Sequence, residues 1–494
     1  MKNLLYIISL CGLLTACDLQ EEPYGFYSDD NFYKSETDAE SGLLYAYNAL
    51  TFLEYSRGIF YIGDIPTETM SPKSDEAGDV YQLENWIAGR ETEQLKYYFK
   101  YCYIAINRAN TVIDHIQNSS VLSETARRRI LGEAYFLRAW NYFNLVRTFG
   151  IVPVQTKMVA ELSQTTPPMA TGLDQLYDLI LGDLTRADNL LEVNKVFGRA
   201  DKVAAQSLMA KAYLTIASSK EHNVHRYTEM RREPRIMYDS AAYWAGKVVR
   251  DYKNVYDFDT NLRDIYDVDK PTGPEHIFIM PIDRSGTQEG NYSKLPLLFL
   301  PSNNSVPFYI RYGNGDLQRA NGNGWGVFLC NDEFVETQFS TTDKRRTELI
   351  HRDIYDASGN PIVPNQVKGY FSSKYVDPDF IGERTSARPY LIRFSDIALV
   401  YAEAAGPEAG LAYVNRIRER AGVTPLPSGM TTDKFREAVI KERALELAFE
   451  GNRLYDLRRT ASVTTTDIKA AGLSEAEAAY YPIPQREIDL NPNL

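Results

Sequence analysis

Three glutamates near the C-terminal end of the chain have a spacing that could support chemistry. Glu442, Glu446 and Glu450 follow one another at intervals of four residues in the segment IKERALELAFEGNRLYDLRR. A helix would place them on one face, where they could ligate a metal ion or act as acid and base. We favour the alternative that this row of carboxylates forms ion pairs that lock helices together.

The histidines offer a second possible site. His222 and His225 lie three residues apart in EHNVH, which is a possible metal pair, but no third ligand is recognisable nearby and the flanks are charged. The chain has no H-E-x-x-H, G-x-S-x-G or Walker motif. The glycine-rich GNGDLQRANGNGWG lacks the strand–turn–helix frame of a phosphate loop. We therefore predict that the protein is not an enzyme and requires no metal or cofactor.

Two chemical alternatives stay open at this stage. The paired carboxylates of a glycoside hydrolase need only converge in space, so the sequence does not exclude them. The aspartate-rich segment 251–269 is a conceivable place for a structural calcium ion, although nothing in it specifies one.

The N-terminus reads as a targeting segment rather than as structure. Lys2 precedes an apolar run that is too short to span a membrane, and small residues then lead to Cys17. The order Leu-Thr-Ala-Cys resembles the lipobox of bacterial lipoproteins, in which the chain is cut before the cysteine and the cysteine takes the lipid. We expect residues 1–16 to be removed and 17–35 to form a flexible tether, because the acidic DLQEE stretch cannot pack. The alternative is an ordinary signal with an incidental cysteine.

Composition limits the partners and the kind of fold. The chain has 494 residues and a formal charge of −12, which argues against nucleic acid because phosphates attract basic surfaces. Beyond Cys17, only Cys102 and Cys330 remain in the mature part, and we expect two buried thiols rather than a disulfide. The 35 tyrosines suit both sugar faces and ordinary helical cores, so their number alone decides nothing.

The elements that must position any site are mainly helices in antiparallel pairs. The periodicity predicts helices at the ranges 37–55, 91–117, 123–149, 173–193, 201–219, 239–251, 389–405, 407–421, 432–450 and 452–459. Ser123 is an expected N-cap, Gly150 an expected stop, and Asp201 an expected cap. The fold class is mainly α, a tetratricopeptide-like stack with a large loop-rich region that carries a few short strands. We divide it into 36–256, a loop-rich insertion at 257–388, and 389–494.

Five stretches together carry a family resemblance. They are EAYFLRAWNYFNLVRTFGIVPV, RPYLIRFSDIALVYAEAA, VNRIRERAG, IKERALELAFEGNRLYDLRR and YYPIPQREIDLNPNL. In this order, and with the lipobox, they resemble the SusD/RagB family of outer-membrane nutrient-binding lipoproteins. The resemblance covers nearly the whole chain except the middle, 257–388.

The resemblance implies a function in nutrient uptake. A lipid on Cys17 would anchor the protein to the outer membrane, exposed at the cell surface, as its only attachment. The helical stack would dock on a SusC-like TonB-dependent transporter and deliver a bound oligosaccharide. Two alternatives remain, a peptide-binding member of the family and a structural transporter lid without a ligand of its own.

Ligand contacts are expected on loops 56–90 and 285–330, because loops on a rigid scaffold carry binding residues. Sugar rings stack on aromatic side chains, and amides can bond their hydroxyls. The candidates are Tyr81, Asn85, Trp86, Tyr292, Tyr309, Tyr312, Asn323 and Trp325. Trp325 is the leading one because its flanking glycines let the ring stand clear of the backbone. Trp140 and Trp244 lie in predicted helices and are expected in the core.

Charged groups in the most apolar helix need partners. Arg138 and Arg147 lie within GEAYFLRAWNYFNLVRTFG, where an unpaired buried charge would be costly. We expect their partners among Glu442, Glu446, Glu450 and Asp456. This hypothesis requires the helices 123–149 and 432–450 to pack in one core.

Lipidation at Cys17 can be tested directly. In cells without the partner transporter, Cys17→Ala should move the protein from the outer-membrane fraction to the soluble fraction, because no other anchor is expected. Membrane partition followed by immunoblot measures this. A Cys102→Ala protein is the control and should still pellet; a Cys17→Ala protein that pellets quantitatively would place the anchor elsewhere.

Overall fold

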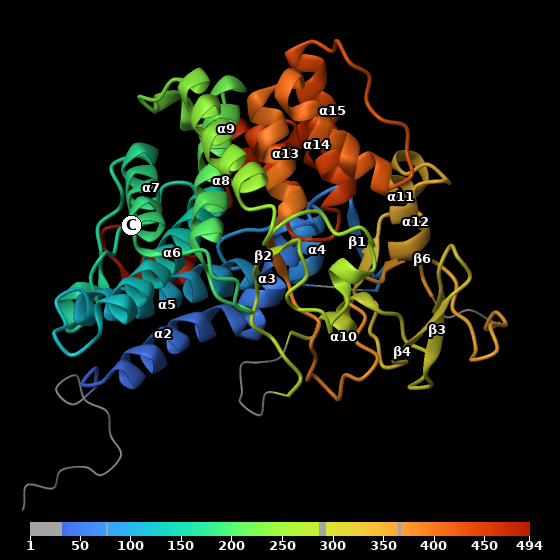
Figure 1. Ribbon diagram of the computed structural model, residues 1–494, viewed down its shortest axis with the longest axis horizontal. Coiled ribbons are helices and arrows are strands. Elements are labelled where there is room, and N and C mark those ends of the chain that lie inside the picture. Colours follow the sequence, from blue (N-terminus) through green and yellow to red (C-terminus); the bar gives the residue numbers. More distant parts are fainter. Residues whose placement is uncertain (1–31, 76–77, 286–292, 364–366) are drawn as a thin grey trace, which may run out of the picture.

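The computed structural model describes residues 32–75, 78–285, 293–363 and 367–494 (Figure 1). The signal segment, Cys17, most of the tether and Tyr292 lie outside these described residues.

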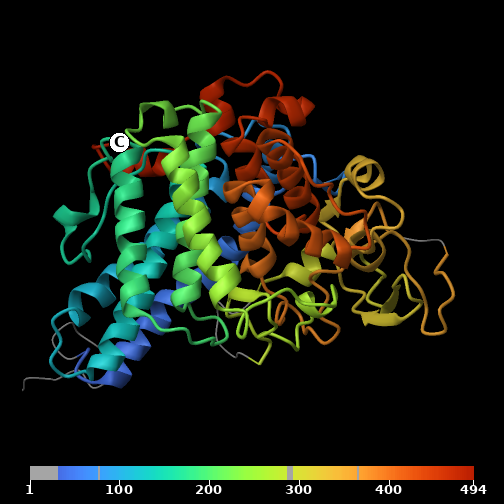
Figure 2. The same cartoon turned by 45° about the horizontal axis from the view of Figure 1, so that its top comes forward.

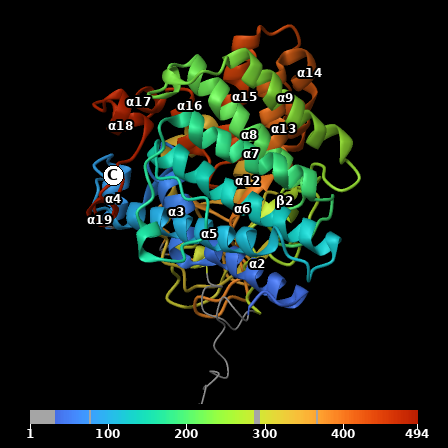
Figure 3. The same cartoon turned by 90° about the vertical axis from the view of Figure 1, so that its left-hand side faces the viewer.

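Helices form the larger part of the structure and stack side by side. Figure 3 shows successive layers from α2 through α5, α6 and α7 to α9 and α14. Direct neighbours in the stack include α5 with α6, α6 with α7, and α8 with α9. The prediction of a mainly α, tetratricopeptide-like stack is therefore confirmed. The N-terminal helices are α2 (Glu36–Thr51), α3 (Leu53–Gly63), α4 (Asp79–Glu84), α5 (Glu93–Ile116), α6 (Glu124–Phe149), α7 (Leu173–Leu190), α8 (Lys202–Glu221) and α9 (Pro234–Asp251).

Local sequence signals fix several helix ends. Ser123 Oγ accepts a hydrogen bond from the Ala126 N–H, and Asp201 does the same for Ala204, so both predicted caps are confirmed. Gly150 ends α6 with a φ of 76°, a value that favours glycine. Segment 56–63, predicted as loop, continues α3 instead.

The C-terminal helices pack on the same stack. They are α13 (Phe394–Ala405), α14 (Pro407–Arg420), α15 (Thr432–Glu446), α16 (Arg453–Arg459), α17 (Val463–Thr466), α18 (Glu475–Ala479) and α19 (Gln485–Leu490). The helix predicted from 389 begins only at Phe394, because residues 390–393 form a strand. The helix predicted to reach residue 450 ends at Glu446, and Phe449 with a φ of 66° belongs to the following turn.

The middle of the chain forms the loop-rich region, which Figure 2 shows to one side of the long helices. Short antiparallel pairs join β1 with β5, β2 with β8, β3 with β4 and β6 with β7. The predicted strands in EHIFIMPID and GWGVFLC are β2 and β5. The remaining strands and the short helices of this region were not predicted, because elements of two to seven residues are too short for periodicity to reveal. The strands are β1 (Met70–Pro72), β2 (His276–Ile279), β3 (Phe308–Arg311), β4 (Leu317–Ala320), β5 (Phe328–Cys330), β6 (Ile350–His351), β7 (Phe371–Ser372) and β8 (Tyr390–Arg393), and the short helices are α10 (Leu295–Phe299), α11 (Asp332–Gln338) and α12 (Lys344–Leu349).

The expected partners of Arg138 and Arg147 are wrong. Arg138 Nε and Nη2 donate to Asp183 on α7 at 2.6 and 2.8 Å, and both side chains are buried. Arg147 donates to Asn144 and stacks over Tyr455 at 3.8 Å. Helix α6 packs between α5 and α7, whereas α15 packs against α13 and α14, so the C-terminal acids belong to another part of the core.

The row of glutamates forms ion pairs, as predicted. Glu442 accepts from Arg345 and Arg418, each at 2.6 Å. Glu450 accepts from Lys374 at 2.6 Å and from Arg393 at 2.8 Å.

Arg393, at the end of β8, lies at the centre of a buried network. Its guanidinium reaches Glu275 at 2.6 Å, Glu446 at 3.3 Å and Glu450 at 2.8 Å, and it is 1% exposed. Arg420 from α14 bonds both Glu275 and Glu446. These cations, with a hydrogen bond from Ser395, lower the pKa of Glu275 to about 2 although its burial opposes that shift.

Two cysteines and two tryptophans are predicted to lie in the core. Cys102 and Cys330 are buried free thiols, as expected, and burial raises the pKa of both. Trp140 is buried in the main core, and Trp244 is partly buried against it. In the described part of the chain, no helix has both the length and the apolar character needed to cross a bilayer.

Removing the central arginine should destabilise the fold. Arg393→Met leaves buried carboxylates unpaired, so we expect a loss of about 3–5 kcal/mol in the free energy of unfolding. Chemical denaturation measures it. Arg352→Met is the matched control, because Arg352 is 52% exposed and its ion pairs are 3.6 Å long; it should cost under about 1 kcal/mol. Equal losses in both variants would contradict a special role for Arg393.

The network should also respond to acid in a defined window. The pKa of Glu275 is depressed from 4.5 to about 2, so its contribution is present above pH 4.5 and is lost as the pH falls toward 2. The stability difference between the unmodified protein and Glu275→Gln should therefore shrink over that interval. Urea titrations at several pH values measure the difference. A difference that stays constant from pH 5 to the lowest pH at which the protein folds would contradict the assignment.

Candidate functional site

Trp325 lies on a loop that is fastened to its neighbours through the backbone. The Trp325 N–H donates to the carbonyl of Leu297 in α10 at 2.6 Å, and the Gly326 N–H donates to Leu300 at 2.9 Å. On the other side, the Asn303 N–H donates to Gly322 at 2.9 Å. The loop is therefore held against residues 297–303 along its length.

Two glycines permit this close approach. A Cβ atom at Gly324 would lie 2.0 Å from the carbonyl oxygen of Leu300, and one at Gly322 would lie 2.0 Å from that of Val306. Gly326 has a φ of 59°, which favours glycine. The glycines therefore act by letting two backbone segments touch, and Trp325 is displayed from a rigid turn.

We call Trp325, Asn323, Asn304 and Lys294 the Trp325 platform. The indole is 46% exposed, and the Lys294 ammonium lies 5.6 Å from its ring centroid. Asn323 and Asn304 are exposed, and their side-chain amides form no hydrogen bond within the described residues. The platform thus combines an apolar ring with free amide donors and acceptors, which is the chemistry that a sugar face and its hydroxyls require.

Charges around the platform are paired with one another. Lys294 lies 2.6 Å from Glu383, and Arg319 lies 3.6 Å from Asp379. Arg319 also donates to the carbonyl of Pro378 at 3.0 Å. A surface with balanced charges suits a neutral ligand better than a polyanion.

The β3–β4 hairpin shares a small core with Leu300, which bonds the turn beside Trp325. Tyr312 is only 6% exposed and belongs to a small second core, and burial raises its pKa to about 12. The Tyr312 ring is therefore covered by the protein, whereas stacking on a sugar would need an open ring face. Tyr309 is half-buried on β3, where its backbone pairs with Tyr355 at 2.8 and 2.9 Å.

The predicted residues of loop 56–90 lie in a separate group. Trp86 is 8% exposed, donates its indole N–H to Asp467 at 3.1 Å and stacks on Tyr481 at 6.2 Å. It fastens the loop to the C-terminal segment, and its ring is covered where stacking on a sugar would need an open face. Tyr81 is 53% exposed, and Asn85 donates its side-chain amide to the Tyr81 carbonyl at 2.9 Å. Tyr292 lies outside the described residues.

Sequence reasoning missed Lys294 and Asn304 as platform residues, and Glu383 as the ion-pair partner of Lys294. Lys294 and Glu383 are far apart in the chain and meet only in the fold, so no local signal marks them. Asn304 has a φ of 53°, which the Asn-Asn-Ser turn sequence could have suggested.

The possible metal pair is not assembled. His222 is exposed and its Nδ1 lies 2.8 Å from the Ser218 carbonyl oxygen, while His225 packs against the ring of Tyr480. Across the described ranges, no group of three or more His, Cys, Asp or Glu side chains could hold a metal ion.

Comparison with known families gives two matches. Residues 353–494 match the model described as the SusD family, and residues 47–214 match a SusD-like model described as "Starch-binding associating with outer membrane". The two matches lie on the N-terminal and C-terminal helical parts, and neither includes the Trp325 platform.

Individual proteins resemble the chain along nearly its full length. SusD-like protein P38 of Formosa agariphila is 26% identical over 99% of this chain and 97% of its own. The crystal structure of a SusD homologue from Bacteroides thetaiotaomicron has a TM-score of 0.77 at 20% identity, covering 95% and 98% of the two chains. A laminarin-binding SusD-like protein has a TM-score of 0.73 at 23% identity, covering 93% and 98%. Together with the two family models, these similarities show that the chain belongs to the SusD/RagB family.

Proposed function

We propose that this protein is an outer-membrane lipoprotein that binds a neutral nutrient oligosaccharide on the Trp325 platform and passes it to a SusC-like TonB-dependent transporter. The observation that carries the proposal is the half-exposed indole on a rigid turn beside free amides. The binding of laminarin by a structural relative supports the same ligand class.

The physical argument for stacking starts from the cost of desolvation. Sugar hydroxyls exchange bonds with water for bonds with protein, so each bond adds little net free energy. Burial of the apolar face of a sugar ring against Trp325 adds to affinity, because no hydrogen bonds to water are lost from that face. Asn323 and Asn304 would then select the orientation of the ring, because their amides both donate and accept.

The remaining parts of the proposal rest on the family. Anchorage through Cys17 agrees with the lipobox, and the family model that matches residues 47–214 is described as associating with the outer membrane. Delivery to a transporter explains why a binding protein would need no catalytic group. We propose accordingly that the protein is not an enzyme.

The platform is tested by one substitution. Trp325→Ala should weaken binding of laminarin oligosaccharides, or of whichever neutral glycan binds in a panel, by about 1–3 kcal/mol because a large apolar contact is lost. The melting temperature should hardly change, since the ring is half-exposed. Isothermal titration calorimetry and thermal unfolding measure the two effects.

Two control variants separate binding from folding. Tyr243→Ala removes a ring that is 56% exposed on α9, away from the platform, and should change neither quantity. Trp86→Ala should cost about 3–5 kcal/mol of stability, as expected for a buried tryptophan, without affecting affinity in the folded fraction. If Trp325→Ala unfolds the protein, or leaves glycan affinity unchanged, the platform is not the binding site.

A further inference from the structure

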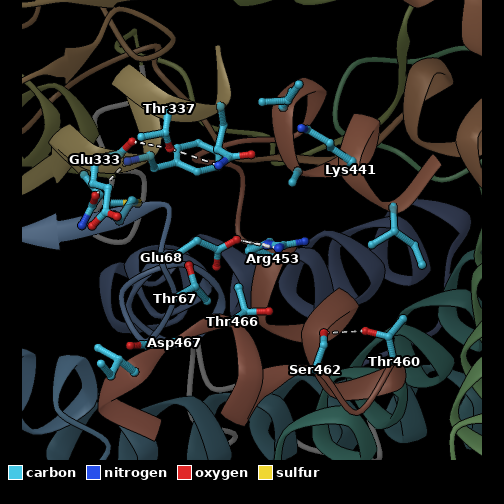
Figure 4. Close-up of a pocket in the computed structure, with 18 of the residues that line it drawn as sticks. Thr67, Glu68, Glu333, Thr337, Lys441, Arg453, Thr460, Ser462, Thr466 and Asp467 are labelled. Carbon is cyan, nitrogen blue, oxygen red and sulfur yellow. Dashed lines mark hydrogen bonds and ion pairs between the residues drawn. The ribbon is translucent and has the colours of Figure 1, made fainter. Parts of the chain in front are cut away.

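A cleft of about 810 Å³ lies among α11, α15, α16, α17 and the segment that follows α3, and its described lining does not include the Trp325 platform. Figure 4 shows Glu333 and Thr337 on one side, Lys441 on the opposite side, and the Glu68–Arg453 pair between them. The volume falls in the range of specific binding sites, about 300–1,000 Å³. We call it the α11–α15 cleft.

Acidic and basic side chains that have no ion-pair partner among the described residues line this cleft. In the part of the chain that the structure describes, the charged groups of Lys441, Glu333 and Glu437 form no hydrogen bond or ion pair, and all three residues are exposed. Glu437 lies one helical turn before Lys441 on α15, whereas Glu333 projects from α11. An occupant with both a basic and an acidic group could pair with these walls.

The Glu68–Arg453 pair between the two sides of the cleft leaves one polar atom of each residue without a hydrogen-bond partner among the described residues. Arg453 Nε donates to Glu68 Oε1 at 2.7 Å, but Arg453 Nη1 and Glu68 Oε2 are buried and have no partner. One donor and one acceptor are thus unsatisfied beside each other, which is unfavourable in the empty protein. Both atoms are covered by the protein, so an occupant could pair with them only once the two side chains turn toward the cleft, where a main-chain amide would supply the carbonyl and the N–H that they lack.

The apolar residues of the cleft favour a polypeptide over a sugar. Among Phe, Tyr and Trp, only Phe334 stands in the described lining, and it is only 4% exposed, so no large ring face of that kind is available for stacking. Ile468, at 90% exposure, stands in the lining as an uncovered aliphatic side chain. Together with the free charges, this aliphatic side chain can contact the charged and aliphatic side chains that a polypeptide carries and a neutral sugar lacks.

We propose that the α11–α15 cleft receives an extended internal segment of a partner protein. That segment carries an acidic side chain for Lys441, a basic side chain for Glu333 and Glu437, and an aliphatic side chain against Ile468. The cleft is separate from the sugar platform, so the proposal does not depend on the proposed function.

Capped peptides can test this recognition. An array of N-acetylated, C-amidated decapeptides places one Lys and one Glu at every separation from two to six residues in a Leu/Ala background. The unmodified protein should bind the peptide with one particular Lys–Glu separation about tenfold more tightly than the same peptide with Gln in place of the charged residues. This difference in affinity should fall as added salt screens the charges.

Matched variants test which residues of the cleft set the preference for charged peptides. Lys441→Gln should abolish the preference for the peptide Glu, and the double variant Glu333→Gln/Glu437→Gln should abolish that for the peptide Lys. Ile468→Ser should weaken every bound peptide. Lys434→Gln and Asp433→Asn alter exposed charges of α15 outside the cleft and should leave binding unchanged, as should Trp325→Ala.

Several results would overturn the proposal. They are equal binding of charged and neutral peptides, no binding by any peptide, unchanged preferences in the wall variants, or binding only by peptides with free termini. The last result would indicate capture of free peptides instead of a protein segment. Loss of glycan binding in Trp325→Ala with peptide binding intact would show that the two sites act separately.

Discussion

The buried carboxylates around Arg393 are the constraint on which the rest of the structure depends. Glu275 comes from the loop before β2, Glu446 from the end of α15 and Glu450 from the turn after it, and all three converge on one guanidinium. Such a group of charges is unstable if any partner is missing. The network therefore requires β2, β8 and α15 to meet in one arrangement and ties the loop-rich region to the helical stack.

The turn after α15 extends this constraint to the N-terminal helices and to the platform. Gly63 at the end of α3 fits against Gly451 so closely that a Cβ atom would lie 2.3 Å from the Gly451 carbonyl oxygen. Tyr375 donates to the carbonyl of Phe449 in the same turn at 2.8 Å, and its ring lies 4.4 Å from that of Phe299 in α10. Since Trp325 is bonded to α10, a continuous set of packed residues connects the ion network to the exposed indole.

Sequence reasoning predicted what depends on local patterns and failed where partners come from distant segments. The helices, the caps at Ser123 and Asp201 and the paired glutamates follow from spacing and residue type. The partner of Arg138 did not follow, because Asp183 is one acid among many and only the stacking order of α6 and α7 selects it. Periodicity likewise could not reveal the two- to seven-residue elements of the loop-rich region.

The aromatic candidates show the same division at the level of single residues. Glycines beside Trp325 indicated an exposed ring, and the contacts of Gly322 and Gly324 give the physical reason. Trp86 has a similar loop context, yet Asp467, 381 residues away, bonds its indole and the C-terminal segment covers its face. Exposure of a loop aromatic is thus decided by whether another segment returns to cover it. Over the platform, the described chain leaves the indole half-exposed, and under the proposed function a ligand covers it.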